Sequence, residues 1–360
     1  MKAIGYYRSL PIDNPESLLD LDITEPVLGD FDLLVEVKAI SVNPVDTKVR
    51  KRAESTDGQP RILGWDAAGV VRAVGAKASR FKPGDKVWYA GDVTRPGSNS
   101  ELHRVDERIV GPMPASLDFA AAAALPLTAI TAWELLFDRL KVQSADPTRD
   151  NTLLVIGAGG GVGSILVQLA RQLTGWTIVG TASREATRDW VSELGAHHVI
   201  DHAKPLAEGL KAAGIAQVSA AIGITHTDEY LAQLVDILEA EGQFALIDDP
   251  KALDVLAFKR KSLSVHWESM FTRSTFQTPQ LARQGEILRR VAELVDRGIV
   301  RSTVAEHFGA INAANLKRAH ALLESGKSRG KIVLEGFGLP PATTPAALLL
   351  RRSPHCAPQR

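Results

Sequence analysis

A glycine-rich turn constrains this chain more than any other feature. The segment VIGAGGGVGSILVQLA, residues 155–170, stands between an apolar run that predicts a strand, Leu153–Ile156, and a periodic run that predicts a helix, Gly163–Leu173. A strand, a glycine turn and a helix in this order are typical of a dinucleotide-binding unit, whereas a glycine-rich match outside that context is weak. The alternative is a glycine turn that binds no ligand.

Small residues occupy the three positions at which such a turn needs them. Ala158 allows the tight reversal, Gly160 lets the backbone approach a diphosphate, and Gly163 lets the helix pack closely on the strand. The diphosphate would then meet free backbone N–H groups at the positive end of the helix, near Gly161 and Val162.

Strands and helices alternate after this turn, and the alternation predicts a doubly wound parallel sheet with right-handed crossovers. The further predicted strands are Thr177–Thr181, His198–Ile200, Val218–Ile222, Gln243–Ile247 and Leu263–Trp267. The predicted helices between them are Glu185–Leu194, Leu206–Ala213 and Asp228–Ala240. The fold class is therefore α/β.

The regions on either side have a different pattern. Short apolar runs at Leu33–Ile40, Ala67–Val74 and Lys86–Tyr89 predict a β-rich first third, and Phe119–Phe137 predicts a helix or a helix pair interrupted at Pro126. The segments predicted after Trp267 are a helix at Pro279–Arg297, a strand at Ser302–Phe308, a helix at Asn312–Leu323 and a strand at Lys331–Leu334. Residues 337–360 are expected to form a disordered tail.

The end of the second strand favours NADP(H) over NAD(H). An NAD site usually has Asp or Glu about 20 residues after the glycines, where it holds the ribose 2′-hydroxyl. This chain has Thr181-Ala182-Ser183-Arg184 there, so no acid would repel a 2′-phosphate. Ser183 and Arg184 would hydrogen-bond it, although Glu185 at the next position argues mildly the other way.

Composition excludes several classes of function. Lys and Arg number 42 and Asp and Glu also number 42, so no net basic charge points to nucleic acid or an anionic membrane. The single cysteine, Cys356, excludes an intramolecular disulfide and a CxxC metal site. The longest apolar stretch, Ala120–Ala132, is broken by Pro126, and Arg8 and Pro11 interrupt any signal peptide, so we expect a cytoplasmic protein.

Several strings resemble the medium-chain dehydrogenase/reductase superfamily over residues 1–337. They are SVNPVDTKVR (41–50), GWDAAGVVRAVG (64–75), FKPGDKVW (81–88), LPLTAITAWELL (125–136) and GAGGGVGS (157–164). They look most like the quinone oxidoreductase branch and its subgroup of zinc-type alcohol dehydrogenase-like proteins. The resemblance implies a GroES-like catalytic domain at 1–126, a Rossmann domain at 127–268, a return to the catalytic domain at 269–336, and the tail.

The zinc ligands of that superfamily are replaced here. Asn43 stands where the zinc-dependent members have a catalytic cysteine, and Trp65-Asp66 stand where they have His-Glu. The third thiolate near Leu125 and the four-cysteine lobe near Asp92–Asn99 are missing as well. Carboxylates without thiolate or imidazole partners do not make a tetrahedral zinc site, so we expect no metal.

Without zinc, a conjugated acceptor is the expected substrate. Hydride addition to a quinone or an α,β-unsaturated carbonyl spreads the charge, so a few hydrogen-bond donors suffice to stabilise it. The candidate catalytic residues, each with a plain structural alternative, are Asn43 (an Asx turn), Asp46 (an exposed acid), Trp65 (a core aromatic), Thr128 (a helix N-cap) and Trp267 (sheet-edge packing). Nothing in the sequence chooses a proton donor among Tyr6, Tyr7 and Tyr89.

The resemblance also implies cofactor contacts near Gly223, Ile247 and Lys331, and a homodimer formed near Val255–Trp267. Two other functions stay open. One is an alcohol or aldehyde dehydrogenase with nonstandard zinc ligands such as Asp46, Asp66 and His103. The other is an NADPH-binding regulatory protein without turnover.

Overall fold

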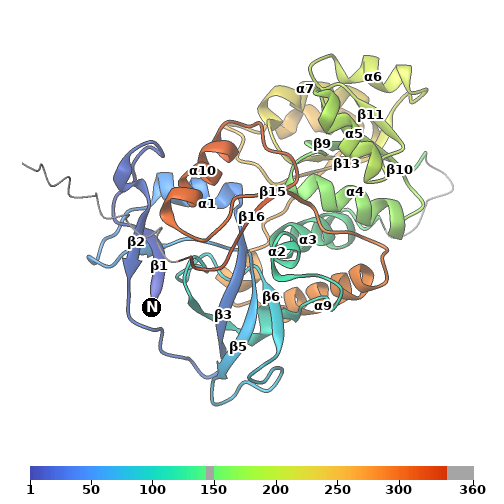
Figure 1. Cartoon of the computed structure of the whole chain (residues 1–360). Helices are drawn as coiled ribbons and strands as arrows, with labels where there is room; N and C mark the ends of the chain where they lie inside the picture. Colours follow the sequence, from blue (N-terminus) through green and yellow to red (C-terminus); the bar gives the residue numbers. More distant parts are fainter. Residues whose placement is uncertain (143–149, 339–360) are drawn as a thin grey trace, which may run out of the picture.

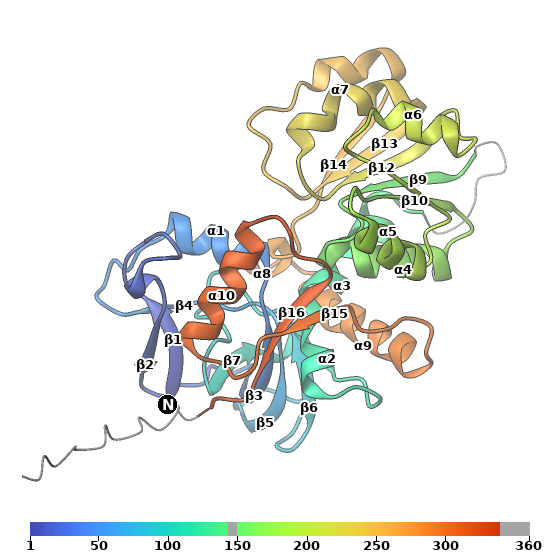
Figure 2. The same cartoon turned by 45° about the horizontal axis from the view of Figure 1, so that its top comes forward.

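The computed structural model describes residues 1–142 and 150–338. Two lobes are visible in Figure 2, a β-rich lobe and a parallel-sheet lobe, and helix α3 lies where they meet. The chain begins in the β-rich lobe, passes through the parallel-sheet lobe and returns (Figure 1). Cys356 and nearly all of the expected tail lie outside the described residues.

The parallel-sheet lobe has six strands in the order β11-β10-β9-β12-β13-β14, all parallel. Its strands are β9 (Thr152–Ile156), β10 (Thr177–Thr181), β11 (His198–Ile200), β12 (Val218–Gly223), β13 (Leu238–Leu246) and β14 (Ser264–Trp267). Its helices are α4 (Gly161–Leu173), α5 (Glu185–Glu193), α6 (Leu206–Ala212), α7 (Thr227–Ile237) and the 3₁₀ turn η4 (Val255–Lys261). This is the Rossmann strand order, which reverses between β9 and β12, and folds of this kind bind their ligands in a crevice at the carboxyl ends of those two strands.

The β-rich lobe contains a seven-stranded sheet, ordered β15-β16-β3-β5-β6-β8 with β7 also paired to β3, and a three-stranded sheet, β2-β1-β4. The strands are β1 (Lys2–Tyr6), β2 (Leu19–Asp22), β3 (Asp32–Ser41), β4 (Arg61–Ile62), β5 (Ala67–Val74), β6 (Lys86–Tyr89), β7 (Leu102–Asp106), β8 (Val110–Pro112), β15 (Val304–His307) and β16 (Lys331–Glu335). Strand β16 therefore comes from the far end of the chain and pairs with β3 near its beginning.

Helices complete the lobe and connect it to the other. They are η1 (Pro15–Ser17), α1 (Pro44–Arg52), η2 (Glu107–Ile109), α2 (Phe119–Ala123), α3 (Pro126–Trp133), the π-helix η3 (Glu134–Arg139), α8 (Thr272–Thr275), α9 (Arg283–Asp296) and α10 (Ala313–Glu324). The predicted interruption at Pro126 is confirmed, because Pro126 is the first residue of α3. Its missing N–H is no loss at that position.

The structure corrects two sequence-based expectations and adds one helix. Helix α7 ends at Ile237 rather than Ala240, because residues 238–240 already belong to β13. The predicted helix at Pro279–Arg297 begins only at Arg283, after the short helix α8. Helix α1 was not predicted, although Asn43 and Asp46 form a capping box at its start.

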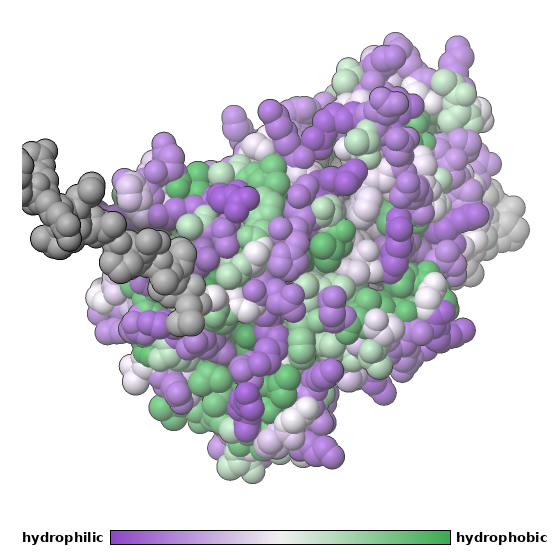
Figure 3. All heavy atoms as spheres, in the orientation of Figure 1, coloured by the Kyte–Doolittle hydropathy of each residue, from purple (hydrophilic) through white to green (hydrophobic). Residues whose placement is uncertain are grey.

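One stretch, Phe119–Arg139, is long and apolar enough to cross a membrane, but 83% of its most apolar window is buried inside the protein. That burial is the pattern of a core helix, and α3 packs against α4. Figure 3 shows separate hydrophobic patches between hydrophilic residues on the face in view.

Candidate active site

The glycine turn leaves an uncapped helix end at the crevice of the parallel sheet. Gly157 follows β9 with φ +86°, and α4 begins at Gly161 without a side-chain cap on its N-terminal N–H groups. A Cβ on Gly163 would lie 2.4 Å from the Gly157 carbonyl oxygen, so only glycine allows this packing. Ala158 is buried, whereas Gly160, Gly161 and Val162 are half-buried at the open side. Free N–H groups at a helix N-terminus fit the diphosphate of a nicotinamide dinucleotide.

The neighbouring strand ends place two further predicted cofactor residues in the same crevice. Gly223 ends β12 beside Ile156, the last residue of β9. The N–H of Ile247, just after β13, donates to the Gly223 carbonyl at 3.2 Å. The structure therefore brings Gly223 and Ile247 together with the glycine turn.

Cationic side chains gather beyond the end of β10. Ser183 and Arg184 are exposed there, and the Arg184 guanidinium donates to the Lys327 carbonyl at 2.9 Å. Arg329 lies over the Trp190 ring, 5.0 Å from its centroid, and donates to the Ala186 carbonyl. The segment 327–330 between α10 and β16 thus lies against the start of α5, and the Gly330 N–H donates to the Gly159 carbonyl at 2.9 Å.

A buried polar cluster lies on the other side of the glycine turn; we call it the Lys331 cluster, made of Asn43, Asp66, Lys331 and the Val42 carbonyl. The Lys331 ammonium donates to Asp66 Oδ2 at 3.0 Å, to the Val42 carbonyl at 2.9 Å and to Asn43 Oδ1. Asn43 Nδ2 donates to Asp66 Oδ2 at 2.8 Å, and the Leu127 N–H donates to Asp66 Oδ1 at 2.8 Å.

Lys331 was predicted only as a cofactor contact, and the structure gives it further contacts. Its stem does lie at the glycine turn, because a Cβ on Gly161 would stand 2.8 Å from Lys331 Cδ and 3.3 Å from Thr128 Cγ2. Its ammonium, however, joins Asn43, a predicted substrate-side residue, and Asp66, which stands at a replaced zinc-ligand position. The resemblance pointed to Lys331, but only the antiparallel pairing of β16 with β3 shows which residues its side chain reaches.

The other predicted substrate-side residues are placed as follows. Asp46 is buried and caps α1, since its Oδ2 accepts from the Asn43 N–H at 2.7 Å, and burial raises its pKa to about 7. The Thr128 hydroxyl donates to the Leu125 carbonyl at 3.1 Å. Trp65 is 2% exposed and its indole N–H donates to the Asp92 carbonyl, which leaves little of the ring for a substrate.

Trp267 is not brought into this group by any contact described. It ends β14 and is 53% exposed. The aromatic ring that packs on Trp65 is instead that of Phe271, with the centroids 6.3 Å apart.

The residues present do not fit a zinc ion. The Lys331 ammonium lies beside Asn43 and Asp66, which stand where the resemblance implies zinc ligands, and a metal ion and an ammonium would repel each other there. His103 is engaged through both ring nitrogens, Nδ1 with the Tyr89 hydroxyl at 3.0 Å and Nε2 with the Pro96 carbonyl at 2.9 Å. Within residues 1–142 and 150–338, no three His, Cys, Asp or Glu side chains gather as metal ligands.

Burial keeps the His103–Tyr89 pair neutral. Desolvation lowers the pKa of His103 to about 4 and raises the pKa of Tyr89. The hydroxyl of Tyr89, a candidate proton donor in the sequence, is therefore committed to His103.

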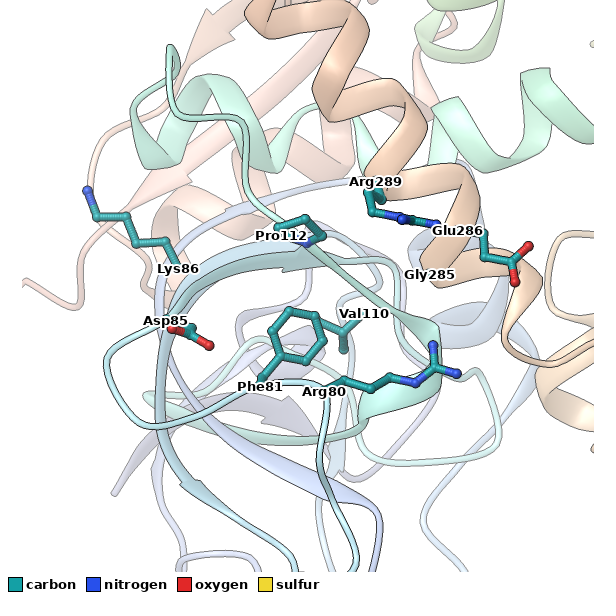
Figure 4. A pocket seen from close by; sticks show the side chains of 9 residues that line it. All are labelled: Arg80, Phe81, Asp85, Lys86, Val110, Pro112, Gly285, Glu286 and Arg289. Carbon is teal, nitrogen blue, oxygen red and sulfur yellow. The ribbon is translucent and has the colours of Figure 1, made fainter.

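A surface cavity of about 680 Å³ lies elsewhere, between the turn at 80–86 and helix α9 (Figure 4). Its lining residues are Arg80, Phe81, Asp85, Lys86, Val110, Pro112, Gly285, Glu286 and Arg289. None of them belongs to the glycine turn or to the Lys331 cluster. This cavity is therefore separate from the candidate active site.

Comparison with known families agrees with this geometry. The family described as alcohol dehydrogenase GroES-like domain matches residues 29–115, and the family described as zinc-binding dehydrogenase matches residues 194–334. A zinc-type alcohol dehydrogenase-like protein of Staphylococcus aureus is 35% identical over 337 residues, which cover 93% of this chain and 99% of that protein. A quinone oxidoreductase of Pongo abelii is 36% identical over 203 residues, which cover 56% of this chain and 59% of that protein.

Solved structures show the same arrangement of elements. A structure from Rhizobium etli CFN 42, described as a candidate zinc-dependent alcohol dehydrogenase, has 53% identity and a TM-score of 0.92 over 94% of this chain and 99% of that chain. The Escherichia coli quinone oxidoreductase complexed with NADPH has 24% identity and a TM-score of 0.77 over 93% of this chain and 100% of that chain, which shows the shared fold alone.

Proposed function

Because this chain belongs to the medium-chain dehydrogenase/reductase superfamily, in its quinone oxidoreductase-like branch, we propose that it reduces a quinone or an α,β-unsaturated carbonyl with NADPH and without a catalytic metal. That it is an oxidoreductase using a nicotinamide cofactor follows from the family. The observation that carries the proposal is the Lys331 ammonium, which is hydrogen-bonded to Asn43 and Asp66, two residues at positions where the resemblance implies zinc ligands in metal-dependent members.

The roles of the chain's own residues follow from the site. The cofactor, when bound, supplies hydride. The uncapped N-terminus of α4, at Gly161–Gly163, would hold its diphosphate, and Gly223 and Ile247 border the same crevice. Asn43 would donate a hydrogen bond to the substrate carbonyl, and the buried surroundings strengthen such a bond.

Preference for NADPH is supported by the cations beyond β10. No acid ends the strand, and Ser183 and Arg184 are exposed, with Lys327 and Arg329 on the segment that lies against them. A 2′-phosphate would meet a charge-assisted donor there, whereas the 2′-hydroxyl of NADH would gain much less.

A cofactor-oxidation assay tests both the substrate class and the metal-free use of NADPH. Wild-type protein with NADPH or NADH is assayed against quinones, enones, aldehydes and alcohols, after dialysis and zinc analysis. We expect turnover of the conjugated acceptors with NADPH. Activity confined to simple aldehydes, or stoichiometric zinc, would refute the substrate class or the metal-free mechanism. Binding of NADPH without any turnover would favour the regulatory alternative.

The variant Arg184→Ala should raise the KM for NADPH about 10-fold or more and leave that for NADH nearly unchanged, since it removes one charged hydrogen bond to a phosphate. The matched control is Arg188→Ala, an exposed arginine of the same helix, α5. Equal losses with both cofactors would contradict the assignment of Arg184.

We also propose a homodimer formed through the outer edge of β14. This strand ends the parallel sheet, and the nearby turn η4 exposes Val255 by 59% and Leu256 by 72%. An open strand edge beside exposed apolar side chains is a usual site of association. Sedimentation should show a dimer that Leu256→Lys weakens. Phe276→Ser, which removes another exposed apolar side chain, should leave the dimer intact. A monomeric wild type would refute the dimer.

A further inference from the structure

The Lys331 ammonium has no donor left for a substrate. It carries three N–H groups, and it has three acceptors: Asp66 Oδ2, Asn43 Oδ1 and the Val42 carbonyl. The residue is 3% exposed, and Asp66 is fully buried. An ammonium with all its donors in use holds its neighbours in place rather than binding a further oxygen.

Those neighbours decide which way the Asn43 amide faces. An ammonium only donates hydrogen bonds, so the amide atom beside Lys331 has to be the oxygen. Both oxygens of Asp66 already accept, Oδ1 from the Leu127 N–H and Oδ2 from Lys331, so the atom beside Asp66 Oδ2 has to be the nitrogen. The opposite orientation would place a donor against a donor and an acceptor against an acceptor. The charges of Lys331 and Asp66 therefore remove the usual ambiguity of an asparagine side chain.

This orientation leaves one donor of Asn43 available. Nδ2 carries two N–H groups, and one of them donates to Asp66. The other has no hydrogen-bond partner among residues 1–142 and 150–338. Asn43 is 1% exposed, so this N–H lies in a buried place, where an unpaired donor costs about 1–3 kcal/mol. Such a group is suited to an acceptor that arrives with a ligand.

We propose that Lys331 and Asp66 are positioning residues that fix the Asn43 amide, so that its free N–H meets the carbonyl oxygen of the conjugated substrate. The inference rests on the proposed function and deepens it. Negative charge develops on that oxygen when the β-carbon receives hydride, and a donor that is already oriented stabilises it without reorganisation. The N–H bond stays intact, and water supplies the proton that completes the product.

The proposal makes the effects of Asn43 and Lys331 depend on each other. Asn43→Ala should lower kcat about 100-fold, the usual loss for one such donor, and leave the KM for NADPH within about 3-fold. Lys331→Met should lower kcat at least about 10-fold, because the amide is then free to turn. The double variant should be no slower than Asn43→Ala, since residues that act through one group are not additive. Lys211→Met, an exposed lysine of α6, is the control.

Multiplied losses in the double variant would overturn the proposal, because Lys331 would then act independently of Asn43. A wild type without reductase activity would instead refute the proposed function, so the two failures are distinguishable. If Lys331→Met does not fold, Lys331→Gln serves in the same cycle, since its neutral amide fixes neither orientation of Asn43.

A spectroscopic test needs no turnover. The sequence holds six asparagines, so asparagine-selective ¹⁵N labelling gives few side-chain signals, and Asn43→Ala identifies the one of interest. That signal should shift in Lys331→Met or Lys331→Gln and stay in place in Lys211→Met. An unchanged signal in the Lys331 variants would show that Lys331 does not orient the amide.

Discussion

Two of the buried charge clusters in the described part of this molecule neutralise their carboxyl groups in different ways. In the Lys331 cluster one cation faces one carboxylate, and each of the polar atoms of Asp66 and Lys331 has a partner. The second, which we call the Glu134 cluster, joins Glu134 and Asp138 of η3, Glu268 after β14, Arg139 and Arg273.

The Glu134 cluster has two carboxyl groups in contact. Arg139 Nε lies 2.7 Å from Glu268 Oε2, and Arg273 pairs with Glu134 Oε1. Glu134 Oε2 and Glu268 Oε1 receive no donated hydrogen bond from the described residues. Burial and the neighbouring Glu268 raise the pKa of Glu134 to about 9, so one proton is held between the two carboxyl groups. One cluster is neutralised by a side chain and the other by a proton.

The stability contributed by each cluster should therefore respond to a different change. A cluster neutralised by a fixed ammonium depends on which residues are present, and a cluster neutralised by a bound proton depends on pH. Removing one partner tests the first, and titration tests the second.

The largest effect is expected from Asp66→Ala. This change leaves the buried Lys331 ammonium without its carboxylate and the Leu127 N–H without its acceptor, so the free energy of unfolding should fall by about 3–5 kcal/mol. Urea denaturation followed by circular dichroism measures it.

The matched control is Asp249→Ala, whose carboxylate is 54% exposed and pairs with Lys48 and Arg52. Exposed pairs contribute at most about 1 kcal/mol. A similar fall in the free energy of unfolding for the two variants would mean that the buried Asp66–Lys331 pair stabilises the fold no more than an exposed ion pair does.

A smaller and pH-dependent effect is expected from Glu134→Gln. The raised pKa means that the folded state holds a proton that the unfolded state has lost, so this site stabilises the fold fully below about pH 4.5 and loses that stabilisation as pH rises towards about 9. Glutamine keeps a donor towards Glu268 at every pH. The stability of the variant relative to wild type should therefore rise between pH 5 and pH 8, by at most about 1.4 kcal/mol per pH unit.

Denaturation curves at several pH values measure that slope. Glu286→Gln, an exposed glutamate of α9, should show no such trend. A pH-independent difference for Glu134→Gln would mean that no proton is held in the Glu134 cluster.

Local patterns in the sequence predicted part of the fold and of the site. The glycine turn and the strand–helix alternation after it are local patterns, and they were enough to predict the α/β fold. The match of Asn43 and Asp66 to zinc-ligand positions came from short strings that resemble a known family. Strand β10 and strand β11 were predicted to the residue, because clear turn residues bound them.

Such local strings could not predict contacts between segments that lie far apart in the sequence. Lys331 lies 265 residues from Asp66 in sequence, and Glu134 lies 139 residues from Arg273, so no periodicity relates either pair. Glu134 reads as an ordinary polar residue of a helix, and its burial follows only from the way η3 packs against the end of β14. For Trp65 the sequence allowed either stacking on a substrate or packing in the core, and its burial and its N–H bond to the Asp92 carbonyl favour the core.

Because β16 is the last of the described strands to be translated, the β-rich lobe stays incomplete during most of synthesis on the ribosome. The 265 residues between Asp66 and Lys331 take roughly 13–50 s to translate at about 5–20 residues per second. Throughout that interval the nascent chain has an uncompensated carboxylate and an open edge on β3, the edge that β16 later pairs with. The β-rich lobe is therefore completed only after the parallel-sheet lobe has been translated. During that interval β3 has an unpaired edge that a chaperone can bind.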